Sequence, residues 1–446
     1  MVNLFEMTRV NSILFSLAIF FLNGTVVFSQ SYFGNGIKIG EVKQDSAIVW
    51  LRLTENPDFR TDGTVFKPED EAIPEGLRLG DMRFSLTGRE GEARVGYRPQ
   101  NGRGFFKWSK WRSVDASKDY TAQFRFSRLD PGTAYEVVAE SRIARSNGKK
   151  IRHEGGFTTA PDSDSDADVS FVVVTCHDFI RRDDPENGHF IYPAMAKLKP
   201  DFLVHAGDIE YYDKPGPWAK TVELARYKWN RLFALPYQRN FYSNHAAYFI
   251  KDDHDTLKND SWPGQTYGEI TWDQGLALFR EQVPMGEKTF RSIRWGKHLQ
   301  IWMVEGRDFR SPNDMTDGPE KTIWGAAQKK WFFDSFERSD ATFRILISPT
   351  PIVGPDRANK NDNHANAGFT HEGDEIRSFL SRQKNAYVIC GDRHWQYVSV
   401  HPDAGVWEFS CGPGADQHAG GSLKTDAKPR TGFCAFWEAF SKSNRV

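Results

Sequence analysis

Residues 205–211 read His205-Ala206-Gly207-Asp208-Ile209-Glu210-Tyr211, and they close a short apolar run that begins at Asp201. A run of this length that is bounded by glycine is typical of a buried strand. In an open α/β sheet, ligands bind just beyond the carboxyl ends of the strands. Asp208 follows the predicted strand directly, so its carboxylate is the first candidate for a functional group.

Three other apolar runs end in the same kind of polar cluster. Cys176-His177-Asp178 follows residues 171–175, Asp252-Asp253-His254-Asp255 follows residues 248–250, and Gly391-Asp392-Arg393-His394 follows residues 387–389. Carboxylates, imidazoles and thiolates are the side chains that hold metal cations. Two neighbouring cations can activate a water molecule and neutralise a transferring phosphoryl group. The four clusters together favour a two-metal phosphoester hydrolase site in which Asp208 bridges the cations.

The segments around these clusters alternate between strands and helices. Helices are predicted at residues 190–198, 219–235, 272–282, 326–338 and 374–383. Strands are predicted at residues 169–175, 201–205, 246–250, 290–293, 299–304, 343–347, 386–390, 397–400 and 406–411. The pattern predicts a layered α/β domain over residues 169–446.

Residues 30–160 have a different pattern, with short alternating runs separated by turns such as Leu129-Asp130-Pro131-Gly132. Strands are predicted at residues 37–40, 46–53, 82–86, 93–97, 121–126 and 135–140. Short, evenly spaced strands predict a small all-β sandwich of the immunoglobulin or fibronectin type. The acidic, small-residue run at 161–168 predicts a linker between the two domains.

The N-terminus has the features of a signal peptide over residues 1–29. Arg9 precedes an apolar stretch from Ile13 to Phe21, and Ser29 offers a small residue at a cleavage point before Gln30. The stretch is too short and interrupted to span a membrane, so no span is expected in the mature chain. The alternative is a buried N-terminal helix. We expect export, to the periplasm or to the medium.

The composition is that of a globular protein, with 39% hydrophobic and 26% charged residues. The net charge is -1, and no run of Lys and Arg resembles a nucleic-acid-binding surface. The four cysteines are too few for a disulfide framework in 446 residues.

The order of the clusters resembles the alkaline phosphatase D (PhoD-like) family of the calcineurin-like metallophosphoesterases. The resemblance rests on Cys176, on Gly-Asp-x-x-Tyr at 207–211, on Asp-Asp-His-Asp at 252–255 and on Gly-Asp-x-His at 391–394. It covers the mature chain. It implies an α/β fold with a layered β-sandwich metallophosphoesterase domain flanked by helices, and hydrolysis of phosphate mono- or diesters by a metal-bound hydroxide.

The resemblance also implies roles for individual residues. The implied metal ligands are Cys176, Asp208, Tyr211, Asp253, Asp392 and His394. Of these, Cys176, Asp208, Tyr211 and His394 would hold Fe(3+), and Asp208, Asp253 and Asp392 would hold a second cation, with one or two Ca(2+) expected. Thiolate and phenolate donors suit ferric iron. A metal-bound thiol is deprotonated, so Cys176 should be free of any disulfide.

Two residues are candidates for contacts with the phosphate. His254 matches a family histidine that contacts the phosphate, and Arg307 could grip an oxyanion through its guanidinium. The alternative for Arg307 is a structural ion pair with Glu305 or Asp308. For Tyr211, the adjacent Tyr212 is a competitor for the role of phenolate ligand.

Two other functions fit the same residues. The site could hydrolyse sulfate esters of a polysaccharide or its oligosaccharides, or the chain could be an inactive surface or carbohydrate-binding homologue. The substrate is a small-molecule or saccharide phosphate or sulfate ester. The sequence leaves open the organic part of that substrate, monoester against diester, the identity of the second metal and the oligomeric state.

Overall fold

The computed structural model describes residues 30–420, apart from residues 101, 103, 144–148 and 357–359. The signal peptide predicted over residues 1–29 lies outside the described residues. Among the helices of the described residues, none is long and apolar enough to cross a membrane.

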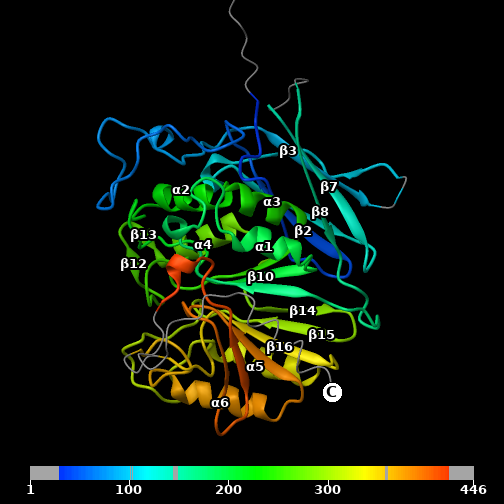
Figure 1. Cartoon of the computed structure of the whole chain (residues 1–446), viewed down its shortest axis with the longest axis vertical. Coiled ribbons are helices and arrows are strands. Elements are labelled where there is room, and N and C mark those ends of the chain that lie inside the picture. The colour runs from blue at the N-terminus through cyan, green and yellow to red at the C-terminus, as the bar shows by residue number, and fades with distance from the viewer. Residues whose placement is uncertain (1–29, 101, 103, 144–148, 357–359, 421–446) are drawn as a thin grey trace, which may run out of the picture.

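Two six-stranded sheets stack face to face in the centre of the molecule (Figure 1). The first has the order β6-β2-β1-β11-β10-β9 and the second the order β14-β15-β16-β17-β19-β18. The strands of the first sheet are β1 (Ile37–Gly40), β2 (Ser46–Arg52), β6 (Thr121–Ser127), β9 (Phe171–Val174), β10 (Phe202–Ala206) and β11 (Ala246–Ile250). Those of the second are β14 (Arg291–Trp295), β15 (Leu299–Met303), β16 (Phe343–Ser348), β17 (Ala386–Cys390), β18 (Tyr397–Val400) and β19 (Trp407–Ser410).

Helices cover the outer faces of both sheets, as Figure 1 shows. The first sheet is covered by α1 (Ile191–Lys197), α2 (Val222–Phe233), α3 (Pro236–Asn244) and α4 (Trp272–Gln282), and the second by α5 (Gly325–Glu337) and α6 (Thr370–Ser381). In α5, Phe332 and Phe336 are one turn apart, so both rings face the sheet, where Phe336 packs on Trp302 at 4.4 Å between ring centroids. The layers therefore run helix, sheet, sheet, helix, which confirms a mixed α/β fold.

The N-terminal strands form the two faces of a small sandwich. Opposite β1, β2 and β6 lies a sheet of β4 (Lys107–Trp108), β3 (Glu92–Pro99), β7 (Ala134–Arg142) and β8 (Ile151–Thr158), with β5 (Arg112–Ser113) also paired to β3. The Asp130 amide donates to the Tyr135 hydroxyl at 2.8 Å, next to the start of β7. A tyrosine that bonds back to the backbone at this corner is a feature of immunoglobulin-like sandwiches.

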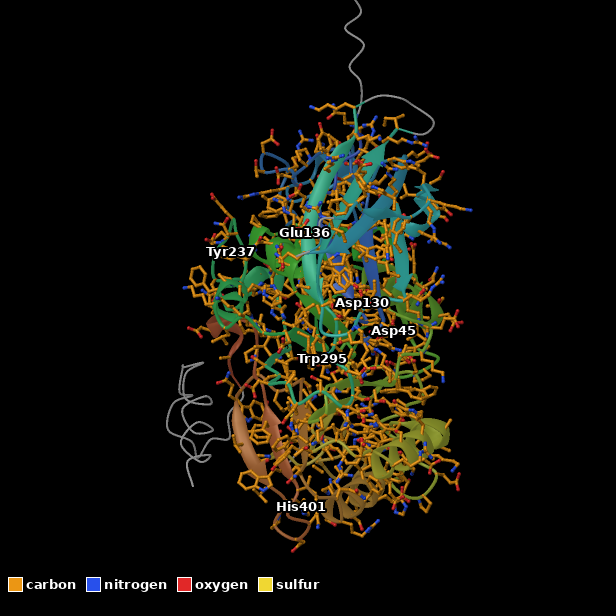
Figure 2. The ribbon with its side chains drawn as sticks, turned by 90° about the vertical axis from the view of Figure 1, so that its right-hand side faces the viewer. Asp45, Asp130, Glu136, Tyr237, Trp295 and His401 are labelled. Carbon is orange, nitrogen blue, oxygen red and sulfur yellow. The ribbon has the colours of Figure 1, made fainter. Side chains whose placement is uncertain are left out.

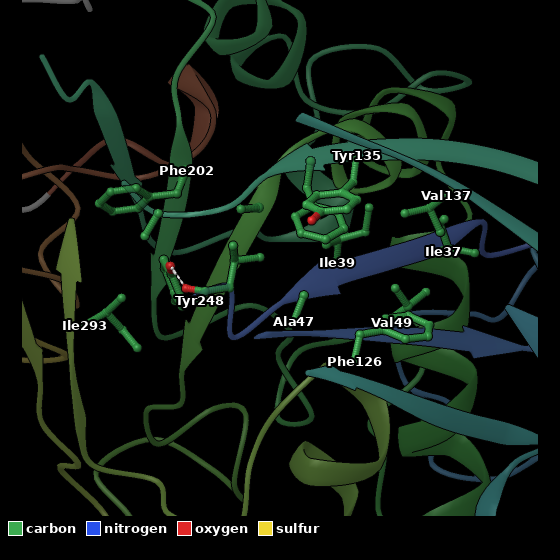
Figure 3. Packing of buried hydrophobic residues seen from close by; sticks show 14 of the residues in the cluster. Ile37, Ile39, Ala47, Val49, Phe126, Tyr135, Val137, Phe202, Tyr248 and Ile293 are labelled. Carbon is green, nitrogen blue, oxygen red and sulfur yellow. Dashed lines mark hydrogen bonds between the residues drawn. The ribbon is translucent and has the colours of Figure 1, made fainter. Parts of the chain in front are cut away.

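The sandwich and the rest of the chain share one sheet. β1 pairs in parallel with β11, and Ile39 lies opposite Ala246. The buried core is also continuous: Figure 3 shows Tyr135 of β7 beside Ile39 of β1 and Val137 of β7 beside Ile37, in the same cluster as Phe202. Figure 2 shows the sandwich face that carries Glu136 at one end of the molecule and the β18–β19 turn with His401 at the other.

The predicted linker contains no helix or strand, and it lies against the β14–β15 turn, where the Lys297 amide donates to the Ser165 carbonyl at 2.8 Å.

The strand predicted at 82–86 is wrong. Phe84 has a φ of 65°, a left-handed conformation that cannot continue a strand. β8 and α3 were not predicted from the sequence. The short elements are β12 (Thr266–Tyr267), β13 (Ile270–Thr271) and the 3-10 helices η1 (Leu79–Asp81), η2 (Ala116–Lys118), η3 (Phe179–Arg181) and η4 (Asp416–His418).

Candidate metal centre

The polar clusters meet because the strands that precede them run in parallel. β9, β10 and β11 are parallel in the first sheet, and β15, β16, β17 and β19 are parallel in the second. Donor atoms within 4.8 Å of one another form three groups among the described residues: Cys176, Asp208 and His394; Asp208, Asp253 and His254; and Asp208, Asp252 and Asp392. The two sheets therefore contribute to one cluster of donors, with Asp208 in every group.

Asp208 lies at the centre of this cluster. Its Oδ2 atom is 3.4 Å from the Cys176 sulfur and 3.3 Å from the Tyr211 hydroxyl. Its Oδ1 atom is buried and has no hydrogen-bond partner among the described residues. Buried carboxylate oxygens are rarely left without a partner, and such an atom fits a bound cation.

The backbone at three of the donors is strained. Cys176, Asp208 and Asp392 have φ angles of 57°, 55° and 62°, in the left-handed region that non-glycine residues rarely adopt. Gly207 precedes Asp208 at a close approach, where an added Cβ would lie 2.7 Å from the Cβ of Asp252. Strain of this kind concentrates at functional sites, where the surrounding structure maintains it. Here it turns each chain sharply at the end of its strand, so that the donors converge.

Burial also disfavours the charged forms of three of the donors. Burial raises the pKa of Asp208 well above its ordinary value, and Asp253, Asp252 and Asp255 raise it further against the opposing effect of His254. Burial likewise raises the pKa values of the Cys176 thiol and the Tyr211 phenol. Ionised forms of all three need compensating positive charge. The residues present therefore fit metal cations.

The imidazole of His254 is oriented by the carboxylate of Asp213. Its Nδ1 lies 2.5 Å from Asp213 Oδ1, and its ring lies 4.3 Å from the Tyr211 ring. Burial opposes protonation, but Asp253, Asp213 and Asp208 outweigh it and raise the pKa of His254 to about 10. The Asn259 amide holds the other oxygen of Asp213 at 2.7 Å. The imidazole is therefore held in a fixed orientation beside the donor cluster.

Arg307 is buried behind the donors. Its Nε donates to Asp252 Oδ1 at 2.6 Å, Nη1 donates to the Ser261 carbonyl at 3.1 Å, and Nη2 lies 3.7 Å from Asp253 Oδ2. The side-chain ion pair considered with Glu305 or Asp308 is not formed. Both of those carboxylates pair with Lys251, each at 2.6 Å.

The structure brings together all the predicted ligands and adds two residues to the site. Asp252 shares a donor group with Asp208 and Asp392, although the sequence had favoured its neighbour Asp253. His418 contacts the rings of Tyr211 and His394, and no motif had indicated it.

By contrast, His205 bonds to His177 at 2.6 Å and belongs to none of the three donor groups. Cys176, Cys390 and Cys411 are free thiols, which confirms the prediction for Cys176.

A two-sheet α/β sandwich with carboxylate, imidazole, thiol and phenol groups at its strand ends defines a metal-dependent phosphoesterase. Residues 171–436 match the family described as PhoD-like phosphatase. The chain belongs to that family and is a phosphoric ester hydrolase.

Individual proteins are similar to this chain in sequence or in fold. Alkaline phosphatase D of Bacillus subtilis (strain 168) is 22% identical to this chain, and the match covers 87% of the chain and 69% of that protein. The solved structure of PhoD superposes with a TM-score of 0.67 at 16% identity, over 86% of this chain and 77% of that one. Purple acid phosphatase PPD1 from seeds of yellow lupin (Lupinus luteus) gives a TM-score of 0.55 at 12% identity, over 85% of this chain and 64% of that one.

Proposed function

We propose that the chain is an exported phosphoesterase that hydrolyses phosphate mono- or diesters at a centre of one ferric ion and one or two calcium ions. The observation that carries this proposal is the position of Asp208. Its carboxylate is shared by three donor groups and keeps one buried oxygen without a partner. Cations held there would polarise the phosphoryl oxygens and lower the pKa of an attacking water molecule.

The chain's own residues would divide the work around that centre. Cys176, Asp208, Tyr211 and His394 would hold the iron, which prefers thiolate and phenolate donors. Asp253 and Asp392, joined by Asp252, would hold calcium through carboxylate oxygens with Asp208. His254 would donate to a non-bridging phosphoryl oxygen or to the leaving group.

We assign Arg307 the role of orienting two carboxylates of the site, in place of direct contact with the substrate. Its guanidinium bonds to Asp252 and lies near Asp253, so it would orient both carboxylates. Because Nε and Nη1 already bond to Asp252 and to the Ser261 carbonyl, the guanidinium would hold these groups rather than a phosphoryl oxygen.

The test is metal analysis of the purified protein together with rates on matched substrates. We expect iron and calcium in the protein, and faster hydrolysis of an aryl phosphate or bis-aryl phosphate than of the corresponding aryl sulfate. Removal of the metals by a chelator should abolish turnover, and readdition should restore it. A faster rate on the sulfate would contradict the proposal, and metal-free protein with full activity would overturn it.

Export has its own test. Sequencing the N-terminus of protein recovered from the periplasm and from the medium should give a chain that begins at Gln30. Protein that retains residues 1–29 and stays in the cytoplasm would contradict export without affecting the proposal for the metal centre.

A further inference from the structure

The loop at residues 411–420, which follows β19, is hydrogen-bonded to two of the predicted ligands. The Gly414 amide donates to the Cys176 carbonyl at 3.2 Å, and the Gly420 amide donates to the His394 carbonyl at 2.9 Å. β19 runs parallel to β17, so this loop leaves its sheet at the same edge as Asp392 and His394. The loop therefore has a defined position beside the metal centre, and it carries His418.

The imidazole of His418 is buried among the donors. The side chain is 2% exposed, and its ring centroid lies 4.1 Å from that of His394 and 5.4 Å from that of Tyr211. Its Nδ1 lies 3.1 Å from the Cys176 carbonyl oxygen. One histidine thus contacts three residues that the family resemblance assigns to the iron.

The hydrogen bond to Cys176 fixes which nitrogen of His418 carries hydrogen. A carbonyl oxygen only accepts hydrogen bonds, so Nδ1 must be the donor. In the neutral imidazole, Nε2 then has a bare lone pair. Nε2 is buried and has no partner among the described residues. A buried acceptor of this kind requires a donor that the protein itself does not supply.

That donor need not be a metal. His418 is absent from the group of Cys176, Asp208 and His394, whose donor atoms all lie within 4.8 Å of one another. Its Nε2 is therefore not placed to share a cation with all three. A phosphate ester without hydroxyl groups offers only acceptors to a bare nitrogen, whereas a water molecule offers two O–H donors.

We propose that His418 is a water-positioning residue, whose Nε2 accepts a hydrogen bond from the water that attacks the phosphoryl group. The inference rests on the proposed function, since it assigns a role at the same centre. The imidazole orients the water, and the anchor on the Cys176 carbonyl orients the imidazole. No proton transfer to His418 is required.

Two substitutions separate the anchor from the acceptor. In H418N, the amide nitrogen can replace Nδ1 as donor to Cys176, but the acceptor at the Nε2 position is lost. In H418Q, the longer side chain can return an acceptor to that position, but the anchor is lost. His245 offers a matched control, because its Nδ1 lies 3.1 Å from the Phe241 carbonyl, at the end of α3 and outside the donor groups.

We expect H418N to lower kcat by roughly tenfold or more, as the loss of one hydrogen bond at the reacting atom does. KM, inhibition by inorganic phosphate, metal content and melting temperature should stay unchanged. H418Q should retain more kcat than H418N. H245N and H245Q should leave kcat unchanged.

Three results would overturn the inference. The first is an unchanged kcat in H418N. The second is a loss of iron in H418N, which would make His418 a metal ligand. The third is a kcat in H418Q below that of H418N. If H418N does not fold, H418Q with the kcat of the parent protein still supports the acceptor role, and H418Q without activity but with full metal content contradicts it. Failure of the proposed function itself would be recognised separately, by parent protein that lacks metal.

Discussion

Asn230 of α2 donates a hydrogen bond of 2.8 Å to the carboxylate of Asp119, which follows η2 in the N-terminal sandwich. The same carboxylate pairs with Arg52 at 2.8 Å and accepts from Gln282 of α4 at 3.0 Å. All four side chains are buried. One side chain thus joins the small sandwich to two helices that cover the first sheet.

We expect D119A to destabilise the whole protein. The substitution leaves the Arg52 guanidinium buried and unpaired, which typically costs about 3–5 kcal/mol in the free energy of unfolding. Urea unfolding followed by tryptophan fluorescence measures it. D62A is the control, because the Asp62 pair with Arg60 is exposed and should change the free energy by less than about 1 kcal/mol. Equal effects from the two substitutions would contradict a joining role for Asp119.

D208N should abolish both metal binding and turnover. The neutral amide is a weak donor, and every donor group in the described site includes Asp208. Iron and calcium contents and the rate on an aryl phosphate measure the effect, and the far-UV circular dichroism spectrum should be unchanged. D334N replaces an exposed carboxylate paired with Lys330 in α5 and should leave metals and rate as they are. A D208N protein with full metal content and full activity would remove Asp208 from the centre.

Y211F should remove the visible absorption band that a phenolate bound to iron(III) gives. The adjacent Y212F is a matched control, because the Tyr212 hydroxyl accepts from the Trp229 indole at 2.6 Å and packs in the helix-covered core. We expect the band to persist in Y212F. A band that disappears in Y212F and survives in Y211F would exchange the roles of the two tyrosines.

Stability should fall in acid through Glu372. Burial raises the pKa of this carboxyl, but hydrogen bonds from His364, Thr322 and the Ile323 amide outweigh burial and lower it to about 2. The folded pKa lies below the ordinary value of 4.5, so Glu372 stabilises the fold above pH 4.5 and loses this effect as the pH falls towards 2. The difference corresponds to about 3 kcal/mol.

Melting temperatures at pH 7 and pH 3 test this prediction. E372Q should melt lower at pH 7 and lose less stability on acidification than the parent protein. E375Q, in the same helix but more exposed, is the control and should follow the parent. Parallel pH profiles for E372Q and the parent protein would contradict the prediction.

The strand ends could be predicted from the sequence because each apolar run stops abruptly at a polar cluster. The presence of Asp252 beside Asp253 in the donor cluster could not be predicted, because it depends on how β11 is oriented against β10 and on the bond from Asp252 to Arg307. β8 was missed because its sequence, Ile-Arg-His-Glu-Gly-Gly-Phe-Thr, is polar and only partly buried.

His418 was missed for a different reason. It follows a Gly-Pro-Gly turn in a stretch without a motif, and only the parallel pairing of β17 with β19 brings that stretch to the other donors. Pairing between strands so far apart in the chain is set by tertiary packing, which local patterns do not record.

The pairing of β1 with β11 has a consequence for how the protein can be divided. The family match begins at residue 171, but the strand that pairs with β11 on one side lies at residues 37–40. A shortened chain that begins at residue 169 would leave β11 as an open edge, with unpaired amides and carbonyls along an apolar strand, a known template for aggregation. The segment that the family match covers is therefore smaller than the segment that completes the first sheet.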